Sequence, residues 1–534
     1  AQAAALKRGI PHRPGSCDVL NYISARWCRW QGQELGAAMT IGGTGCPELP
    51  PSSKFSHTGC VWSVDAEAYR RLKEGAYINH DGAGLFPTCL LMLIYPGTVC
   101  FQQLIADAAD KHLSRWPAKL VGEFGCAVLP LTIAFATPHT AWLAMANLVW
   151  VCAALVAERE KVLAWPRLLM RMRATRAVRK EGVYAPGFTH IDAAGTRLRF
   201  VAEYRAVIMI TTCIVILAVD FPSIFPRSHA KTEEYGYSLM DLGTGCIVCA
   251  SAVVSRAARG VAQGPCSGAV LRRLASIWPL LLMGLVRLVV LSGMDYHVPT
   301  SEYGVHWNFF FTLAVVAIVA TALDLGQQAS VAVGVVLLVA YELLLTVGGF
   351  AEYILHAPRT GLFSANREGI MSCAGYLGIH WLSVGLGSLC VAPSTQRQRE
   401  AHGTARRLLM VAGGALGVAQ VLDFAGLPAS HRMCNLAYAV LVIGVDALVL
   451  GTLAFLDLYW PWTRRPLPHV YGGVQESMLV AFLLGNLLTG AVNVAAQPLL
   501  MPPWAALLTL AIYSFVLFVP LGVLRSRGKA LKLS

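Results

Sequence analysis

The stretch AVDFPSIFPRSHAKTEEYGYSLMDLGTG, residues 218–245, concentrates the side chains that could do chemistry in an otherwise apolar chain. Ionised groups are costly beside hydrocarbon, so charges that gather between apolar runs are candidates for function. We interpret the stretch as the rim of a candidate active site. Its titratable residues are Asp220, Arg227, His229, Lys231, Glu233, Glu234 and Asp241.

Asp220 and Lys231 are the predicted catalytic residues of this stretch. Asp220 ends an apolar run and precedes Phe221 and Pro222, which are expected to stop a helix. A partly desolvated carboxylate there is a candidate general base, and Lys231 is a candidate partner across the turn. The lysine could orient that carboxylate, stabilise an oxyanion or hold a phosphate. From residue chemistry alone, a plain interfacial salt bridge is the alternative.

Three further candidates for substrate binding lie in and between the predicted spans 274–293 and 306–324. In SEYGVHWNFFF, Glu302 and His306 are four residues apart, so a helix that begins there would place both on one face. A hydrogen-bonded interfacial histidine is the simpler alternative for His306. Arg287 interrupts an apolar run, and we expect it to face the interior, toward a carboxylate or a phosphate.

Asn366 and Arg367 in the NREGI motif complete the predicted substrate-binding set. The fork of an arginine suits the geometry of a phosphate or a carboxylate, and a loop-stabilising pair is the alternative. No metal site is predicted, because the C-x-x-C of Cys246 and Cys249 lies in an apolar run with no second ligand pair nearby.

The composition defines the elements that must position these residues. Of the 534 residues, 56% are hydrophobic and 14% are charged, whereas an ordinary soluble domain is about one quarter charged. Long, continuous apolar runs predict transmembrane helices rather than the alternating strands of a barrel. The predicted fold is all-α, a polytopic membrane bundle of about thirteen helices. The predicted spans are 86–106, 119–137, 140–157, 203–220, 238–255, 274–293, 306–324, 329–348, 374–392, 406–426, 434–456, 477–495 and 503–524.

The net charge of +13 does not indicate a nucleic-acid partner, because the basic residues lie in short loops between the spans. The positive-inside rule places the most basic loop, residues 158–199, in the cytoplasm. Alternation then puts four polar loops together on the luminal side. They are residues 220–237, 294–306, 349–373 and 426–433.

Two parts of the chain differ in character. Residues 1–68 have no clear periodicity and are treated as an extension of unknown structure, while residues 69–534 form the predicted membrane domain. Residue chemistry alone indicates a polar site with a carboxylate, a lysine and arginines, which could bind an anionic lipid and could equally belong to a transporter. A multi-span lipid or anion transporter or flippase is the alternative, although no inverted repeat is evident. An oligomeric state is not indicated.

Several stretches together resemble the glycosylphosphatidylinositol (GPI) inositol acyltransferases. Besides residues 218–245, they are SIWPLLLMGLVRLVV, SEYGVHWNFFFTLA, NREGIMSCAGYLGIH, RMCNLAYAV and LLGNLLTGAVN, in chain order. The resemblance implies a multi-pass enzyme of the endoplasmic reticulum membrane. It implies transfer of an acyl chain from acyl-coenzyme A, as a co-substrate, to the inositol ring of glucosaminyl-phosphatidylinositol, with no bound cofactor.

The resemblance also implies that Asp220 and Lys231 are the catalytic pair. This chain departs from the family's usual DFPxFPRRFAKTE by one extra residue between Asp220 and Pro226, and by Ser228 and His229. A bulge in the turn could absorb the extra residue, or the residue could change the distance from Asp220 to Lys231. Because coenzyme A is cytoplasmic and the predicted site is luminal, we also expect a tunnel between the spans.

Overall fold

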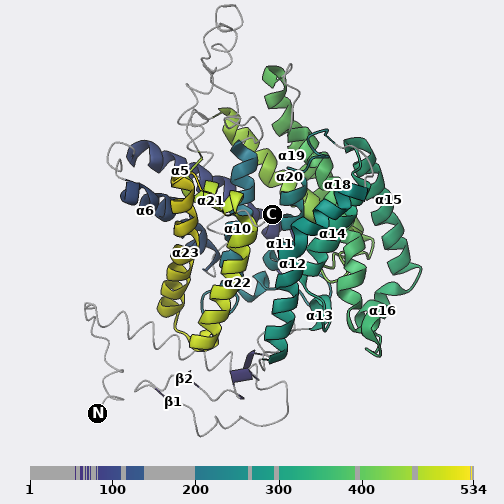
Figure 1. The fold of residues 1–534 in the computed structure, drawn as a ribbon, viewed down its shortest axis with the longest axis horizontal. Helices are drawn as coiled ribbons and strands as arrows, with labels where there is room; N and C mark the ends of the chain where they lie inside the picture. The colour runs from purple at the N-terminus through teal and green to yellow at the C-terminus, as the bar shows by residue number, and fades with distance from the viewer. Residues whose placement is uncertain are drawn as a thin grey trace, which may run out of the picture.

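A computed structural model provides the fold of the chain (Figure 1). It describes residues 82–109, 116–136, 199–261, 267–293, 300–390, 397–459 and 467–529, together with residue 531 and short stretches between 54 and 80. Within these residues the architecture is a helical bundle, with one small antiparallel strand pair, β1 (Lys54–Phe55) and β2 (Val61–Ser63).

The described helices follow one another in this order: α4 (Leu85–Met92), α5 (Ile94–Ala109), α6 (Trp116–Ala127), α7 (Leu129–Phe135), α10 (Arg199–Ala218), η2 (Arg227–His229), α11 (Leu239–Ala252), α12 (Ser267–Gly293), α13 (Thr300–Tyr303), α14 (Phe309–Leu323), α15 (Gln327–Thr346), α16 (Phe350–His356), α17 (Leu362–Ala365), α18 (Arg367–Cys390), α19 (Arg397–Phe424), α20 (Leu436–Tyr459), α21 (His469–Glu476), α22 (Met478–Ala495), η4 (Pro498–Leu500) and α23 (Pro503–Ser526).

The centre of the bundle is formed by α10 and α20. Of the residues in the apolar part of α10, 89% are buried, and α10 contacts α11, α20, α21 and α22. Figure 1 shows α10 and α11 between α15 and α16 on one side and α5, α6 and α23 on the other. The loop that follows α10 therefore starts from the most enclosed helix of the structure.

The outer helices have the opposite character. Only 17% of the apolar part of α19 is buried, and large apolar side chains such as Phe424 on α19 and Leu487 on α22 are exposed. A helix that remains apolar on its outward side is suited to lipid rather than to water. The chain is a helical membrane bundle, as the composition predicts.

Twelve of the predicted spans coincide with described helices, while 140–157 lies outside the described residues. Eight helices in the described ranges are long and apolar enough to cross a membrane, so the number thirteen stays a prediction. The prediction of one helix over 119–137 was wrong in detail, because α6 and α7 are separated at Val128. Pro130 lies at the beginning of α7, a position that tolerates its missing N–H group.

Candidate active site

Four polar loops of the described chain are joined to one another. They lie between α10 and α11, between α12 and α14, between α15 and α18, and between α19 and α20. The Ser430 hydroxyl donates to the carbonyl oxygen of Glu234 at 2.6 Å, which joins the first loop to the last. The Val305 N–H group donates to the carbonyl oxygen of Ala365 at 2.9 Å, which joins the middle two. These contacts bring the loops together in pairs, and the predicted luminal placement of all four stays a prediction.

An ion pair joins the first loop to the second. Lys231 Nζ lies 2.7 Å from Glu302 Oε2, and their side chains are 27% and 29% exposed. Burial disfavours both charged forms, but the attraction between the two groups outweighs it. The carboxylate of Glu302 raises the pKa of Lys231, and the ammonium lowers the pKa of Glu302. Both residues are therefore charged at neutral pH. Lys231 Nζ also lies 5.9 Å from the centre of the Tyr303 ring.

A cavity of about 220 Å³ opens beside this ion pair. Its walls come from α4, α5, α10, α11, α12, α13, α14 and α22 and from the loop between α10 and α11, and most of the lining side chains are apolar. Its charged side chains are those of Lys231, Glu302 and Arg287. The other lining residues are Met92, Tyr95, Ile208, Thr211, Thr212, Val215, Ile216, Leu239, Met240, Leu242, Gly243, Thr244, Cys246, Ile247, Tyr303, Phe309, Phe482 and Asn486.

Two of the predicted substrate-binding residues thus meet in one cavity. Arg287 projects from α12 into the interior, as its position in an apolar run predicts, and its positive charge helps to lower the pKa of Glu302. Together with Lys231, Arg287 gives the cavity two cations against the one carboxylate of Glu302. Such a balance favours an anionic group, for example a phosphate or a developing oxyanion.

Asp220 lies at the end of α10 and has a different partner from the one predicted. Its Oδ2 accepts a hydrogen bond from Asn493 Nδ2 at 2.7 Å, and Asn493 Oδ1 accepts one from Lys73 Nζ at 2.8 Å. The predicted pairing of Asp220 with Lys231 was wrong, because the helices bring Glu302 to the lysine. Asp220 follows Ile216, a cavity-lining residue, by four positions, about one helical turn or ~6 Å along the axis.

The loop after Asp220 is a compact turn. The N–H groups of Ile224 and Phe225 both donate to the carbonyl oxygen of Phe221, at 3.1 and 3.0 Å. His229 follows in η2, is buried, and packs edge-on against Phe225 with ring centres 6.0 Å apart. Burial lowers the pKa of His229 to about 4, so this histidine is neutral and belongs to the packing of the turn.

Asn366 ties two of the loops together instead of lining the cavity. Its Oδ1 accepts hydrogen bonds from the backbone N–H groups of His306 and Trp307, at 2.7 and 2.9 Å. Its Nδ2 donates to the carbonyl oxygen of Leu362 at 2.9 Å. The side chain of Asn366 is therefore occupied by backbone groups, and it fixes the loop that follows Glu302.

The predicted helix through Glu302 and His306 was wrong. Helix α13 ends at Tyr303, Gly304 has a φ of 105°, and α14 begins only after Asn308, whose Oδ1 caps it. A positive φ suits glycine and breaks the helical run. His306 therefore lies in the connecting loop with its side chain exposed, on a different element from Glu302, and it is not among the residues that line the cavity.

Arg367 is also directed away from the cavity. Its Nε donates to the carbonyl oxygen of Ile354 at 2.7 Å, and its guanidinium lies 5.6 Å from the centre of the Tyr353 ring. With a side chain that is only 3% exposed, it holds α16 against the start of α18. The neighbouring Glu368 is fully buried and pairs with Arg359. The loop-stabilising alternative describes the geometry of this motif.

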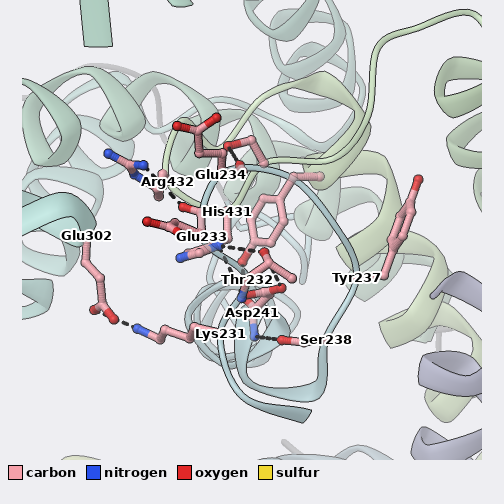
Figure 2. Close-up of polar contacts among 12 residues, drawn as sticks. Lys231, Thr232, Glu233, Glu234, Tyr237, Ser238, Asp241, Glu302, His431 and Arg432 are labelled. Carbon is pink, nitrogen blue, oxygen red and sulfur yellow. Dashed lines mark hydrogen bonds and ion pairs between the residues drawn. The ribbon is translucent and has the colours of Figure 1, made fainter. Parts of the chain in front are cut away.

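The structure adds a second polar group that the sequence did not single out. Asp241 Oδ1 lies 3.1 Å from His431 Nδ1 and also accepts the Thr232 N–H group at 3.1 Å, while Oδ2 accepts the Thr232 hydroxyl at 2.9 Å. Figure 2 shows these side chains beside the ion pair of Lys231 and Glu302. In the sequence, Asp241 is one of the titratable residues of the stretch 218–245. His431 lies 190 positions later and was included in the predictions only as part of the polar loop 426–433.

Metal coordination is not suggested by the described side chains. Within those residues, no three His, Cys, Asp or Glu side chains are grouped so that they could hold an ion. Cys246 and Cys249 are buried and free of disulfides. The charged groups that line the cavity are a carboxylate, a lysine and an arginine.

Comparison with known proteins finds relatives that match over most of this chain. A protein of Arabidopsis thaliana without an assigned function is 38% identical over 333 residues, which cover 62% of this chain and 75% of that protein. The phosphatidylinositol-glycan biosynthesis class W protein of Dictyostelium discoideum is 28% identical, over 84% of this chain and 96% of its own length. The GPI-anchored wall transfer protein 1 of Aspergillus oryzae is 29% identical, over 81% and 93%.

The sequence model of one family spans most of the chain. The model of the GWT1 family matches residues 69–524, which include helices α4 to α22, all but the last two residues of α23, and all the residues that line the cavity. The family resemblance drawn from the sequence motifs is confirmed. The chain belongs to the GWT1 family.

Proposed function

We propose that this protein transfers an acyl chain from acyl-coenzyme A to an inositol hydroxyl of glucosaminyl-phosphatidylinositol, in the endoplasmic reticulum membrane. Relatives that match over most of the chain are named for GPI-anchored wall transfer and for phosphatidylinositol-glycan biosynthesis. These names support a role in GPI-anchor biosynthesis. The observation that carries the proposal is the cavity, whose wall is mostly apolar and which holds the charged side chains of Lys231, Glu302 and Arg287.

The composition of the cavity suits both parts of the reaction. An acyl chain gains free energy when apolar walls replace water around it, about 0.8 kcal/mol for each buried CH₂ group. Lys231 and Arg287 offer the positive charge that an acceptor lipid's phosphate or the thioester oxyanion needs. Glu302 holds the ammonium of Lys231 in place before the substrates bind.

The proposed reaction needs one base and one stabilising cation. Asp220 takes the proton from the inositol hydroxyl as the oxygen attacks the thioester carbon. A C–O bond forms, the C–S bond breaks, and coenzyme A leaves as its thiolate. Lys231 stabilises the negative charge that develops on the carbonyl oxygen. Asn493 and Lys73 orient the carboxylate of Asp220 through their hydrogen bonds.

The acyl donor must reach a site at the opposite end of the membrane from its own compartment. We propose that the thioester enters between the spans from the cytoplasmic side and that coenzyme A remains near the basic loops. Residues 158–198, the most basic of these loops, lie outside the described residues. Crosslinking of a photoreactive acyl-coenzyme A to the cytoplasmic side of the cavity would support this route, and labelling confined to the luminal loops would contradict it.

Loss and restoration of the protein test the proposed function. Microsomes that lack it should accumulate non-acylated glucosaminyl-phosphatidylinositol, and the intact chain should restore the acylated lipid. A matched chain with Asp220→Asn, expressed and inserted to the same level, is the control for effects unrelated to chemistry. If the acylated lipid forms normally without the protein, the proposed function is wrong.

A further inference from the structure

His431 presents a hydrogen-bond acceptor that the described structure does not use. Its Nδ1 lies 3.1 Å from Asp241 Oδ1, and a carboxylate oxygen can only accept, so Nδ1 carries the proton. The neutral ring then has its lone pair on Nε2. Burial of the ring lowers the pKa of His431, although the carboxylate of Asp241 opposes this, so the neutral form is present at pH 7.

This acceptor is enclosed. The His431 side chain is only 9% exposed, and Nε2 is buried without a hydrogen-bond partner among the described residues. A buried polar atom without a partner costs about 1–3 kcal/mol, so it needs an explanation in water, strain or function. The other ring nitrogen has a fixed partner, which makes Nε2 a preorganised site for a donor.

The His431 ring lies close to charged side chains that line the cavity. The charges of Lys231 and Glu302 both act on the ring, and Figure 2 shows it with Asp241 on one side and this ion pair on the other. The ion pair is the more exposed part of the cluster and lines the cavity. A polar group that is held at the ion pair is therefore a candidate donor for Nε2.

We propose that His431 Nε2 binds a hydroxyl group of the acceptor lipid's polyol headgroup, and that Asp241 fixes the tautomer that makes this possible. The proposal rests on the proposed function and adds a specificity site to it. The headgroup phosphate competes with Glu302 for Lys231, and the loosened pair lets a headgroup hydroxyl reach the ring. The acyl donor does not use this site.

Steady-state kinetics of His431→Asn in microsomes test the proposal. The asparagine amide can replace Nδ1 in the contact with Asp241, but it has no atom at the position of Nε2. The KM for glucosaminyl-phosphatidylinositol should rise ~10-fold, the value of one hydrogen bond to a buried group, while the KM for acyl-coenzyme A stays unchanged. His431→Gln, whose amide oxygen reaches the position of Nε2, should recover part of the acceptor affinity.

Tyr438→Phe provides the matched structural control. Its hydroxyl donates to the backbone carbonyl of Asp241 at 2.7 Å, so the variant loosens the same region without touching the ring. It should leave both KM values unchanged. An unaltered acceptor KM in His431→Asn would overturn the proposal, as would an equal rise in both KM values. Absence of acylation by the wild-type chain would instead overturn the proposed function.

Discussion

Asp220 and Asp241 flank the same loop and are equally buried, yet they have different partners. Asp220, at the end of α10, accepts a hydrogen bond from the neutral amide of Asn493. Asp241, in the first turn of α11, accepts from a backbone N–H group and a hydroxyl of Thr232 and faces His431. Burial alone therefore does not distinguish the two carboxylates, whereas the partners that the structure gives them do.

The difference assigns the two carboxylates to different tasks. The oxygens of Asp241 are used to hold a loop and a histidine ring, so changes there should act on binding through His431. Asp220 lies about one helical turn from a residue of the cavity wall and accepts a hydrogen bond from the side-chain amide of Asn493. Changes at Asp220 should therefore act on the chemical step.

Replacement of the two carboxylates is the strongest test of this comparison. Asp220→Asn keeps the shape but removes the base, so kcat for acylation should fall by at least ~100-fold. Asp241→Asn should mainly raise the acceptor KM. Initial rates in microsomes, with equal insertion of both variants, measure the effects. Near-normal kcat in Asp220→Asn, or a larger kcat loss in Asp241→Asn, would break the assignment.

The ion pair gives the next largest effect. If Lys231 stabilises an oxyanion, Lys231→Ala should lower kcat ~100-fold, and the added change Glu302→Gln should not restore it. If the pair only holds two loops, the double variant should recover activity, because the unpaired carboxylate is removed as well. As a half-exposed pair, it should contribute only about 1 kcal/mol to stability. A double-mutant cycle on kcat separates the two cases.

A smaller effect is expected from the residues that orient Asp220. Asn493→Leu removes the donor to Asp220 and the acceptor for Lys73 Nζ, so kcat should fall ~10-fold with both KM values unchanged. Lys73→Met removes the donor to Asn493 Oδ1 and should have a weaker effect in the same direction. A larger loss in Lys73→Met than in Asn493→Leu would show that the lysine has a role of its own.

The sequence could predict the helices and the grouping of polar residues in the loops between them, because both depend on local patterns. Apolar runs mark the spans, and the charge of Arg287 forces it into the interior. The partner of Lys231 could not be predicted in this way. Glu302 lies 71 positions from it and reaches it only because α10, α12 and α14 pack as they do. Proximity in the sequence favoured Asp220, and the tertiary packing overrode it.

The sequence-based predictions missed or misplaced other residues for a similar reason, namely contacts that local patterns do not reveal. The role of His431 depends on a contact with Asp241 from another helix, and nothing in its own loop marks that contact. His306 was misplaced because a spacing of four was interpreted as a helical face, although Gly304 between the two residues already permits a break. From the sequence, Asn366 and Arg367 resemble ligands for a phosphate. In the structure their side chains bind backbone carbonyl and N–H groups, and such partners cannot be recognised in a sequence.

The pH dependence of acceptor binding should give the smallest and most specific effect. Neutral His431 accepts a hydrogen bond, and its protonated form cannot, so the acceptor KM should rise as the pH falls through the pKa of the ring. Burial places that pKa below the ordinary value of 6.5. The charges that act on the ring are Asp241 and Glu302, which favour protonation, and Lys231 and Arg432, which oppose it.

This dependence can be separated from the titration of the substrate itself. The acceptor KM is measured from about pH 5 to about pH 8 for the wild type and for His431→Asn, which share the same lipid. Only the wild type should show the additional rise at acidic pH. Glu302→Gln removes a charge that favours protonation, so it should move the rise to lower pH. Identical pH profiles in the wild type and His431→Asn would show that Nε2 does not contact the acceptor, and would make Asp241 a purely structural carboxylate.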